Sequence, residues 1–152
     1  MPNKNNIFIG LSAEYFVAAE LSRRYFSASV TLKNTPGIDI IAINPETEKM
    51  FCIQVKAKSQ TGKRKEWLLD KKDEQVKGDN FFYAFVNLNM RNLGKQTEAQ
   101  PDIYIIPAKV VAKQIKENDK KFTKKGGKVQ SMRVFKLPKD DEGKYQNWDI
   151  LK

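Results

Sequence analysis

Short apolar runs, separated by polar segments that contain glycine or proline, make up most of this sequence. The runs are rich in Ile, Val, Phe and Tyr, which indicates β-strands. The predicted strands cover residues 29–32, 38–44, 50–58, 81–88, 102–106 and 132–137. Residues 81–88 form the most apolar run, which is typical of a central strand that is buried on both faces.

Two other segments have the periodicity of a helix. The first covers approximately residues 11–26, and its apolar stripe consists of Leu11, Ala18, Leu21 and Tyr25. Glu14 also lies on this stripe, where a carboxylate is costly unless it is paired or bound to a metal ion. The second helix opens at Pro107, a favoured position for proline, and extends to about Lys116. The lysine-rich segment 120–128 is expected to form an exposed loop.

The order of these elements predicts the fold class. A helix precedes three strands, and after a connection come a further strand and then a strand followed by a helix, which is typical of an α/β protein. We therefore expect a three-layer sandwich, with a central mixed β-sheet flanked by helices. The chain has 152 residues, of which 40% are hydrophobic and 30% charged. This length and composition suit one folded domain over residues 1–152.

Polar side chains interrupt two of the predicted strands. Side chains alternate across a strand, so Gln54, Lys56 and Lys58 share one face of the strand 50–58. Its other face is apolar and consists of Phe51, Ile53, Val55 and Ala57. Asp39 interrupts the preceding strand near its start. If the two strands pair, an acid, an amide oxygen and a cation converge, and these groups hold a divalent metal ion against a phosphodiester.

Each of these residues also has a purely structural interpretation. Asp39 follows Pro-Gly and suits the end of a turn, Gln54 suits a hydrogen-bonded polar position, and Lys56 suits a solvated edge strand. Glu14 suits a helix residue that pairs with an arginine. We favour a functional site because the four residues form a combination and because the strand of Lys56 has the apolar face of an inner strand.

The charge of the chain restricts its chemistry further. The net charge is +10, which favours an anionic partner such as nucleic acid, and the chain contains no histidine. A Ser-His-Asp triad and a histidine-based zinc site are therefore excluded. A metal ion at this site would be a hard cation on oxygen ligands.

The cysteine count and the first residues indicate where the protein works. The single cysteine, Cys52, allows no internal disulfide, which suits a reducing compartment. The polar start does not have the pattern of a signal peptide, and no apolar segment is long enough to span a membrane. We expect a cytoplasmic protein without a membrane partner.

The combination of Glu14 in the first helix, Asp39 in the second strand and Gln54-x-Lys56 in the third resembles the PD-(D/E)XK nuclease superfamily. Members of this superfamily have the restriction-endonuclease-like fold and cut DNA or RNA with divalent metal ions. The resemblance covers residues 10–59. This sequence differs from the usual motif in having Gln54 at the position of an acid, which supplies a carbonyl oxygen but no negative charge.

The resemblance implies a set of roles for these residues. Glu14, Asp39, Gln54 and Lys56 would form the catalytic set. Mg²⁺ or Mn²⁺ would be bound by Asp39, the side-chain oxygen of Gln54, the backbone carbonyl of Val55 and Glu14. Lys56 would orient or activate the attacking water and stabilise the transition state.

Basic residues that follow the predicted site are candidates for binding nucleic acid. They are Lys58, Lys63, Arg64 and Lys65. Such residues would contact the phosphate backbone and supply affinity that does not depend on sequence, although each also suits a solvated loop. Trp67 comes directly after them, and both base stacking and core packing remain open for this residue.

Two functions are therefore predicted. The first is a metal-dependent endonuclease that hydrolyses phosphodiester bonds, with DNA favoured over RNA. The alternative is a catalytically inactive module that retains the nuclease fold and binds nucleic acid, an interpretation that the neutral Gln54 supports. An interaction domain without nucleic acid leaves the basic charge and Lys56 unexplained. A homodimer is also expected, since related nucleases often pair to cut two strands.

Overall fold

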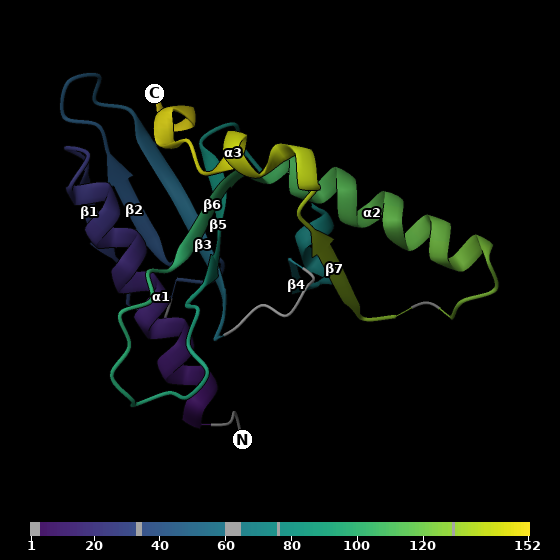
Figure 1. Cartoon of the computed structure of the whole chain (residues 1–152). Coiled ribbons are helices and arrows are strands. Elements are labelled where there is room, and N and C mark those ends of the chain that lie inside the picture. The colour runs from purple at the N-terminus through teal and green to yellow at the C-terminus, as the bar shows by residue number, and fades with distance from the viewer. Residues whose placement is uncertain (1–3, 33–34, 60–64, 76, 129) are drawn as a thin grey trace.

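A mixed β-sheet forms the centre of the protein (Figure 1). The structure, a computed structural model, describes residues 4–32, 35–59, 65–75, 77–128 and 130–152. Within these residues the sheet has five strands, in the spatial order β1 (Ser27–Val30), β2 (Ile40–Ile43), β3 (Met50–Lys58), β5 (Phe81–Asn87) and β6 (Asp102–Pro107). Neighbouring strands are antiparallel except β3 and β5, which run parallel.

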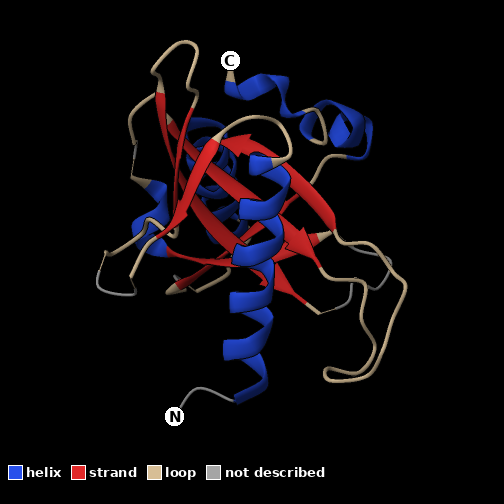
Figure 2. Ribbon diagram, turned by 90° about the vertical axis from the view of Figure 1, so that its left-hand side faces the viewer, coloured by secondary structure: helices blue, strands red, loops and turns tan. Residues whose placement is uncertain are grey.

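Helical layers cover both faces of this sheet (Figure 2). Helix α1 (Lys4–Ser22) packs on one face. Helix α2 (Ala108–Lys124) packs on the other, together with a small antiparallel sheet made of β4 (Glu66–Asp70) and β7 (Met132–Lys136). The remaining short helices are η1 (Lys71–Glu74), η2 (Lys139–Asp141), α3 (Glu142–Tyr145) and η3 (Trp148–Leu151). The predicted α/β three-layer sandwich is confirmed.

Each face of the sheet buries its own apolar cluster. Ile40, Ile53 and Phe82 belong to the cluster beneath α1. Tyr83 and Phe85 belong to the cluster beneath α2 and β4. Because side chains alternate along a strand, Gln54 and Lys56 face the second cluster, as their register partners Tyr83 and Phe85 do. The predicted division of β3 into an apolar and a polar face is thus confirmed.

Helix α1 differs from the prediction in its bounds and in its buried stripe. It begins at Lys4 and ends at Ser22, and its buried residues are Ala13, Val17 and Leu21. The predicted stripe ended at Tyr25, which is instead 86% exposed and lies beyond the helix with φ at 64°. Apolar residues surround this helix on most sides, so their period alone does not select the buried face.

Helix α2 extends further than predicted. It continues to Lys124, so the lysine-rich segment expected as a loop is helical over most of its length. The helix ends where Gly126 adopts φ 85° and the N–H of Gly127 donates to the carbonyl of Phe122, a glycine-based helix terminus. The apolar periodicity stops after Ile115, but lysine is a good helix former and carries the helix on. Within the described residues, no helix is both long and apolar enough to cross a membrane.

We expect the centre of β3 to be decisive for stability. Ile53→Ala removes a fully buried side chain and should lower the free energy of unfolding by about 2–5 kcal/mol. The matched control is Ile43→Ala, at a side chain that is 39% exposed, where the loss should stay below about 1 kcal/mol. Urea unfolding of both variants measures the difference. Equal losses would contradict the assignment of Ile53 to the core.

Candidate active site

Asp39 stands where the pairing of β2 with β3 ends. Its backbone N–H donates to the carbonyl of Ile53 at 2.9 Å, which continues the pattern of the sheet by one residue. Its carboxylate then accepts a hydrogen bond of 2.7 Å from the backbone N–H of Val55. The side chain thus supplies the acceptor that the β2 backbone would supply if the pairing went on. Burial raises the pKa of Asp39, although the Val55 N–H and the charges of Lys56 and Lys77 partly oppose this shift.

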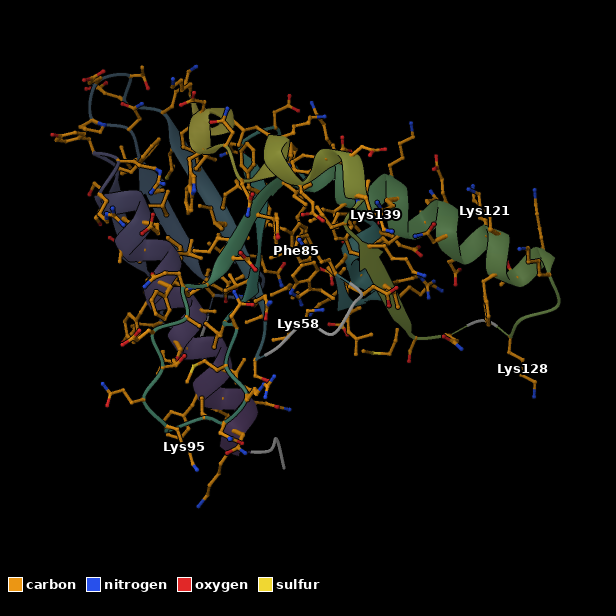
Figure 3. The ribbon with its side chains drawn as sticks, in the orientation of Figure 1. Lys58, Phe85, Lys95, Lys121, Lys128 and Lys139 are labelled. Carbon is orange, nitrogen blue, oxygen red and sulfur yellow. The ribbon has the colours of Figure 1, made fainter. Side chains whose placement is uncertain are left out.

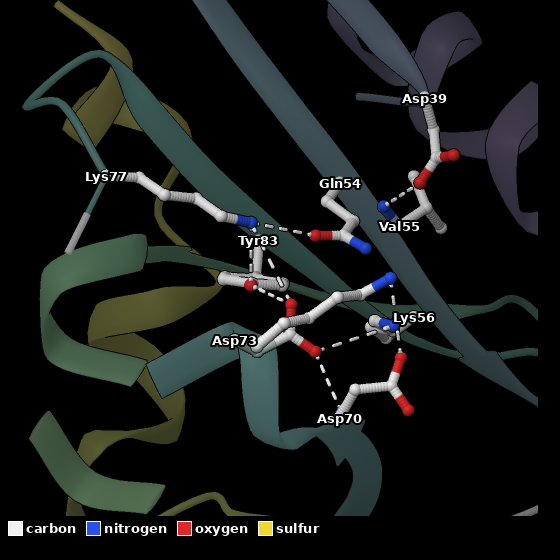
Figure 4. Close-up of polar contacts among 9 residues, drawn as sticks. Asp39, Gln54, Val55, Lys56, Asp70, Asp73, Lys77 and Tyr83 are labelled. Atoms are coloured by element: carbon white, nitrogen blue, oxygen red, sulfur yellow. Dashed lines mark hydrogen bonds and ion pairs between the residues drawn. The ribbon is translucent and has the colours of Figure 1, made fainter. Parts of the chain in front are cut away.

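Gln54 is the neighbour of Asp39 on β3. Because Ile40 pairs with Ile53, the antiparallel register places Asp39 opposite Gln54. The side chain of Gln54 is buried, and its oxygen accepts a hydrogen bond of 3.1 Å from the ammonium of Lys77. Figure 4 shows the amide oxygen pointing toward Lys77.

A chain of polar contacts continues from Lys77 into the second apolar cluster (Figure 4). The Lys77 ammonium lies 3.0 Å from the hydroxyl oxygen of Tyr83, and this hydroxyl donates to Asp73 Oδ1 at 2.8 Å. The other oxygen of Asp73 accepts from the backbone N–H of Asp70 at 2.9 Å. Burial, together with the neighbouring Asp73 carboxylate, raises the pKa of Tyr83 well above its ordinary value. The Tyr83 hydroxyl therefore stays a donor.

Lys56 joins the same network through Asp73. Its ammonium lies 4.0 Å from Asp73 Oδ2, while Lys77 lies 3.8 Å from Asp73 Oδ1. Asp73 is only 2% exposed. A buried carboxylate is stable only when it is paired and hydrogen-bonded, and here two ammonium groups, a hydroxyl and a backbone N–H meet that need. We name the group Asp39, Gln54, Lys56, Asp73, Lys77 and Tyr83 the polar network.

Three of the four predicted catalytic residues, Asp39, Gln54 and Lys56, lie on adjoining strands within this network. Glu14 lies on α1, which packs on the opposite face of the sheet, and it is half-buried. Glu14 is not one of the six residues of the polar network. Its role as a metal ligand stays a prediction.

Sequence reasoning missed Asp73, Lys77 and Tyr83. The segment that carries Asp73 and Lys77 has no apolar period, and η1 covers Lys71–Glu74 within it. Tyr83 was correctly assigned to the core, but a buried tyrosine hydroxyl also needs a polar partner. That need was the one available signal, and it does not identify the partner.

The predicted nucleic-acid-binding residues have mixed outcomes. Lys63 and Arg64 lie outside the described residues. The Lys58 ammonium donates to the carbonyl of Glu66 at 2.5 Å, and Lys65 pairs with Glu142 at 2.6 Å. Both lysines therefore make intramolecular contacts, and their contact with phosphate stays a prediction.

Trp67 and the lysines of α2 can also be placed. Trp67 is buried and its indole N–H donates to the carbonyl of Val86 at 3.1 Å, so core packing rather than base stacking explains it. Lys121 and Lys128 lie on the end of α2 and the segment after it, which project away from the central sheet (Figure 3).

The oxygen atoms near Asp39 suit a hard cation. Asp39 offers a carboxylate and Gln54 an amide oxygen. The carbonyl of Val55 is directed to the same side of β3 as its N–H, toward Asp39. Within the described residues, no group of three or more His, Cys, Asp and Glu side chains is placed to hold a metal ion. A donor set with one carboxylate and two neutral oxygens fits Mg²⁺, which commonly keeps several water ligands.

We expect the Tyr83 hydroxyl to stabilise the fold through its two contacts. Tyr83→Phe leaves the buried Asp73 without one donor and should lower the free energy of unfolding by about 1–3 kcal/mol. Tyr104→Phe is the matched control, because the buried hydroxyl of Tyr104 makes no hydrogen bond of good geometry among the described residues, although the Lys65 ammonium acts on it. That variant should change the free energy by less than about 0.5 kcal/mol. Urea unfolding compares them, and an equal effect would argue against the Asp73 contact.

Comparisons with known proteins concern the fold. No family profile matches the sequence, and no curated protein does. A bacterial homing endonuclease, I-Ssp6803I, has a similar structure with a TM-score of 0.53 and 14% sequence identity, over 99% of this chain and 93% of that one. Hjc, a Holliday junction resolvase from the archaeal hyperthermophile Archaeoglobus fulgidus, gives a TM-score of 0.46 and 14% identity, over 88% and 95% of the two chains. The similarity to the homing endonuclease, at this low sequence identity, concerns the fold, and it agrees with the predicted restriction-endonuclease-like architecture.

Proposed function

We propose that this protein is a metal-dependent endonuclease that hydrolyses phosphodiester bonds in DNA. The observation that carries the proposal is the placement of Asp39, directly before β2, beside Gln54 and Lys56 on β3. A homing endonuclease of similar fold makes DNA a more natural substrate than RNA. The net charge of +10 agrees with a nucleic-acid partner.

In this proposal Asp39, the Gln54 oxygen and the Val55 carbonyl hold Mg²⁺ or Mn²⁺, with Glu14 as a further predicted ligand. A bound divalent ion would lower the pKa of a coordinated water and neutralise charge on the scissile phosphate. Lys56 would donate to a phosphate oxygen and orient the attacking water. Asp73 positions Lys56, because its buried carboxylate lies 4.0 Å from the ammonium. Phosphoryl transfer requires mainly such positioning and charge neutralisation.

An open hollow beside the polar network suits the phosphate backbone. It has a volume of about 670 Å³ and lies between η1 and α2, lined by Lys71, Lys72, Glu74, Gln75 and Lys116. Lys72 directly precedes Asp73 in the chain, and its charge adds to that of Lys56 in lowering the pKa of Lys77, which burial lowers most. The hollow adjoins the polar network at η1, because Lys72 and Glu74 flank Asp73 in the chain.

The cleavage test compares variants of the two residues with the clearest roles. Asp39→Asn and Lys56→Met should each reduce the rate of Mg²⁺-dependent cleavage by about a hundredfold or more, because each removes a charge that acts at the reacting phosphate. Labelled duplex, branched and single-stranded DNA, and RNA, are the substrates. Lys49→Met, at an exposed lysine between β2 and β3, is the control and should retain the wild-type rate.

The same assay distinguishes the alternative function. Cleavage by the wild type that survives Asp39→Asn would contradict the proposed site. Binding of nucleic acid without cleavage by the wild type would instead indicate the inactive binding module. A homodimer also stays a prediction, and sedimentation equilibrium of the free protein tests it.

A second prediction concerns the hollow between η1 and α2. The double variant Lys72→Gln/Lys116→Gln should bind duplex DNA more weakly, and the slope of log affinity against log salt should fall by about two, since two phosphate contacts are lost. Lys49→Gln paired with Lys139→Gln removes the same charge at two other exposed positions and is the matched control. Fluorescence anisotropy at several salt concentrations measures both slopes. Equal slopes for the two double variants would contradict this surface.

A further inference from the structure

We propose that Lys77 is a built-in competitor of divalent cations at the candidate metal site. Its ammonium binds the Gln54 oxygen that the metal ion would use. The inference rests on the proposed metal-dependent function and adds to it a residue that determines how tightly the metal binds.

Lys77 and Gln54 are joined by a direct hydrogen bond between their side chains. An ammonium group only donates hydrogen bonds. The Lys77 ammonium, which lies 3.1 Å from Gln54 Oε1, therefore binds the amide group through its oxygen. The amide NH₂ then points away from Lys77 (Figure 4). A metal ion needs this same oxygen, because the NH₂ group is no ligand for a hard cation. The ion therefore has to share the oxygen with Lys77 or displace it.

Several other groups hold the Lys77 ammonium in place. Its ammonium also contacts the Tyr83 hydroxyl at 3.0 Å and lies 3.8 Å from Asp73. It lies over the aromatic ring of Phe81, 4.2 Å from the ring centre, a favourable cation–π geometry. Only 23% of its side chain is exposed. Displacing the ammonium would break all these contacts together.

Gly37 lies beside the Lys77–Gln54 contact and adopts φ 75° in the turn before β2. A Cβ atom at this position would lie 3.9 Å from Gln54 Oε1 and 4.0 Å from Lys77 Nζ. Because glycine has no Cβ, the turn leaves room for about one side-chain carbon beside the contact. A metal ion on the Gln54 oxygen would therefore have to fit next to the Lys77 ammonium or displace it.

The charge of the polar network also opposes the binding of a metal ion. It contains two carboxylates, Asp39 and Asp73, and two ammonium groups, Lys56 and Lys77, so its charges balance without a metal ion. A divalent cation on the Gln54 oxygen would lie within a few ångströms of the Lys77 charge and be repelled by it. A neutral residue at position 77 would leave the network with an excess negative charge that favours a cation.

Metal titration of the full chain without nucleic acid tests the inference. Mn²⁺ binding is followed by electron paramagnetic resonance, which measures the free ion, for wild type, Lys77→Met and Lys49→Met. Lys77→Met should bind Mn²⁺ about tenfold or more tightly than wild type, because one nearby positive charge is removed. Lys49→Met is the matched control. Lys49 is exposed between β2 and β3, five residues before Gln54, so removing its charge should change the Mn²⁺ affinity less than about threefold.

Two further variants distinguish a change in metal affinity from a loss of folding in Lys77→Met. Lys77→Gln retains a hydrogen-bond donor without the charge and should also bind Mn²⁺ more tightly than wild type. Adding Asp39→Asn to Lys77→Met should abolish the gain. Unchanged or weaker binding by both Lys77 variants, each shown to be folded by circular dichroism, would overturn the inference, as would an equal gain in Lys49→Met.

Failure of this inference can be told apart from failure of the proposed function. If Lys77→Met gains Mn²⁺ affinity but neither it nor the wild type cleaves any nucleic acid, the competitor role stands and the nuclease proposal fails. If the wild type cleaves with Mg²⁺ and Lys77→Met gains no affinity, the nuclease proposal stands and the competitor role fails.

Discussion

The register between β2 and β3 is the constraint on which the candidate site depends. Ile40 pairs with Ile53, and both are buried beneath α1. This apolar pair fixes the register of β2 against β3, because a slip by one residue would turn every side chain of a strand to the opposite face of the sheet. The same register leaves Asp39 opposite Gln54 at the end of β2. The burial of two isoleucines therefore positions the polar groups, although neither isoleucine has any chemistry of its own.

The polar network shows how the fold tolerates charge beneath a sheet. Asp73 is almost fully buried, and a carboxylate at such a position would destabilise the protein by several kcal/mol if it were left alone. Its oxygens instead receive the Tyr83 hydroxyl and the Asp70 N–H, with Lys56 and Lys77 nearby. The network restrains the ammonium of Lys56 through Asp73, while 22% of the Lys56 side chain remains exposed. Positioned in this way, Lys56 has lost much of its freedom before any substrate arrives.

The sequence was sufficient to predict the part of the site that depends on strand alternation. Gln54 and Lys56 share a face because side chains alternate along a strand. Asp39 was expected beside them if the two strands paired, and the observed register makes them pair. Asp73 and Lys77 could not be found in this way. Their segment contains no apolar period, and their position follows from where η1 packs, which only the tertiary structure decides.

The helices show the same limit. In α1 the apolar residues are too many to select a buried face, so the stripe assigned to it was wrong in part and ended at the exposed Tyr25. In α2 they are too few after Ile115 to reveal that the helix goes on. Periodicity identifies a helix well when about half of its surface is apolar, and both helices depart from that condition in opposite directions.

Gln54 and Lys77 are best understood as a pair. A neutral amide beside an ammonium leaves the charges of the network balanced, with Asp39 and Asp73 matching Lys56 and Lys77. A glutamate at position 54 would carry a charge and would bind the Lys77 ammonium more strongly than glutamine does. Changing residue 54 alone would therefore strengthen the competitor. Changing both residues removes the competitor and adds the ligand charge together. The departure from the usual nuclease motif at Gln54 is thus tied to a lysine 23 positions later in the chain, which no inspection of the motif alone would have linked to it.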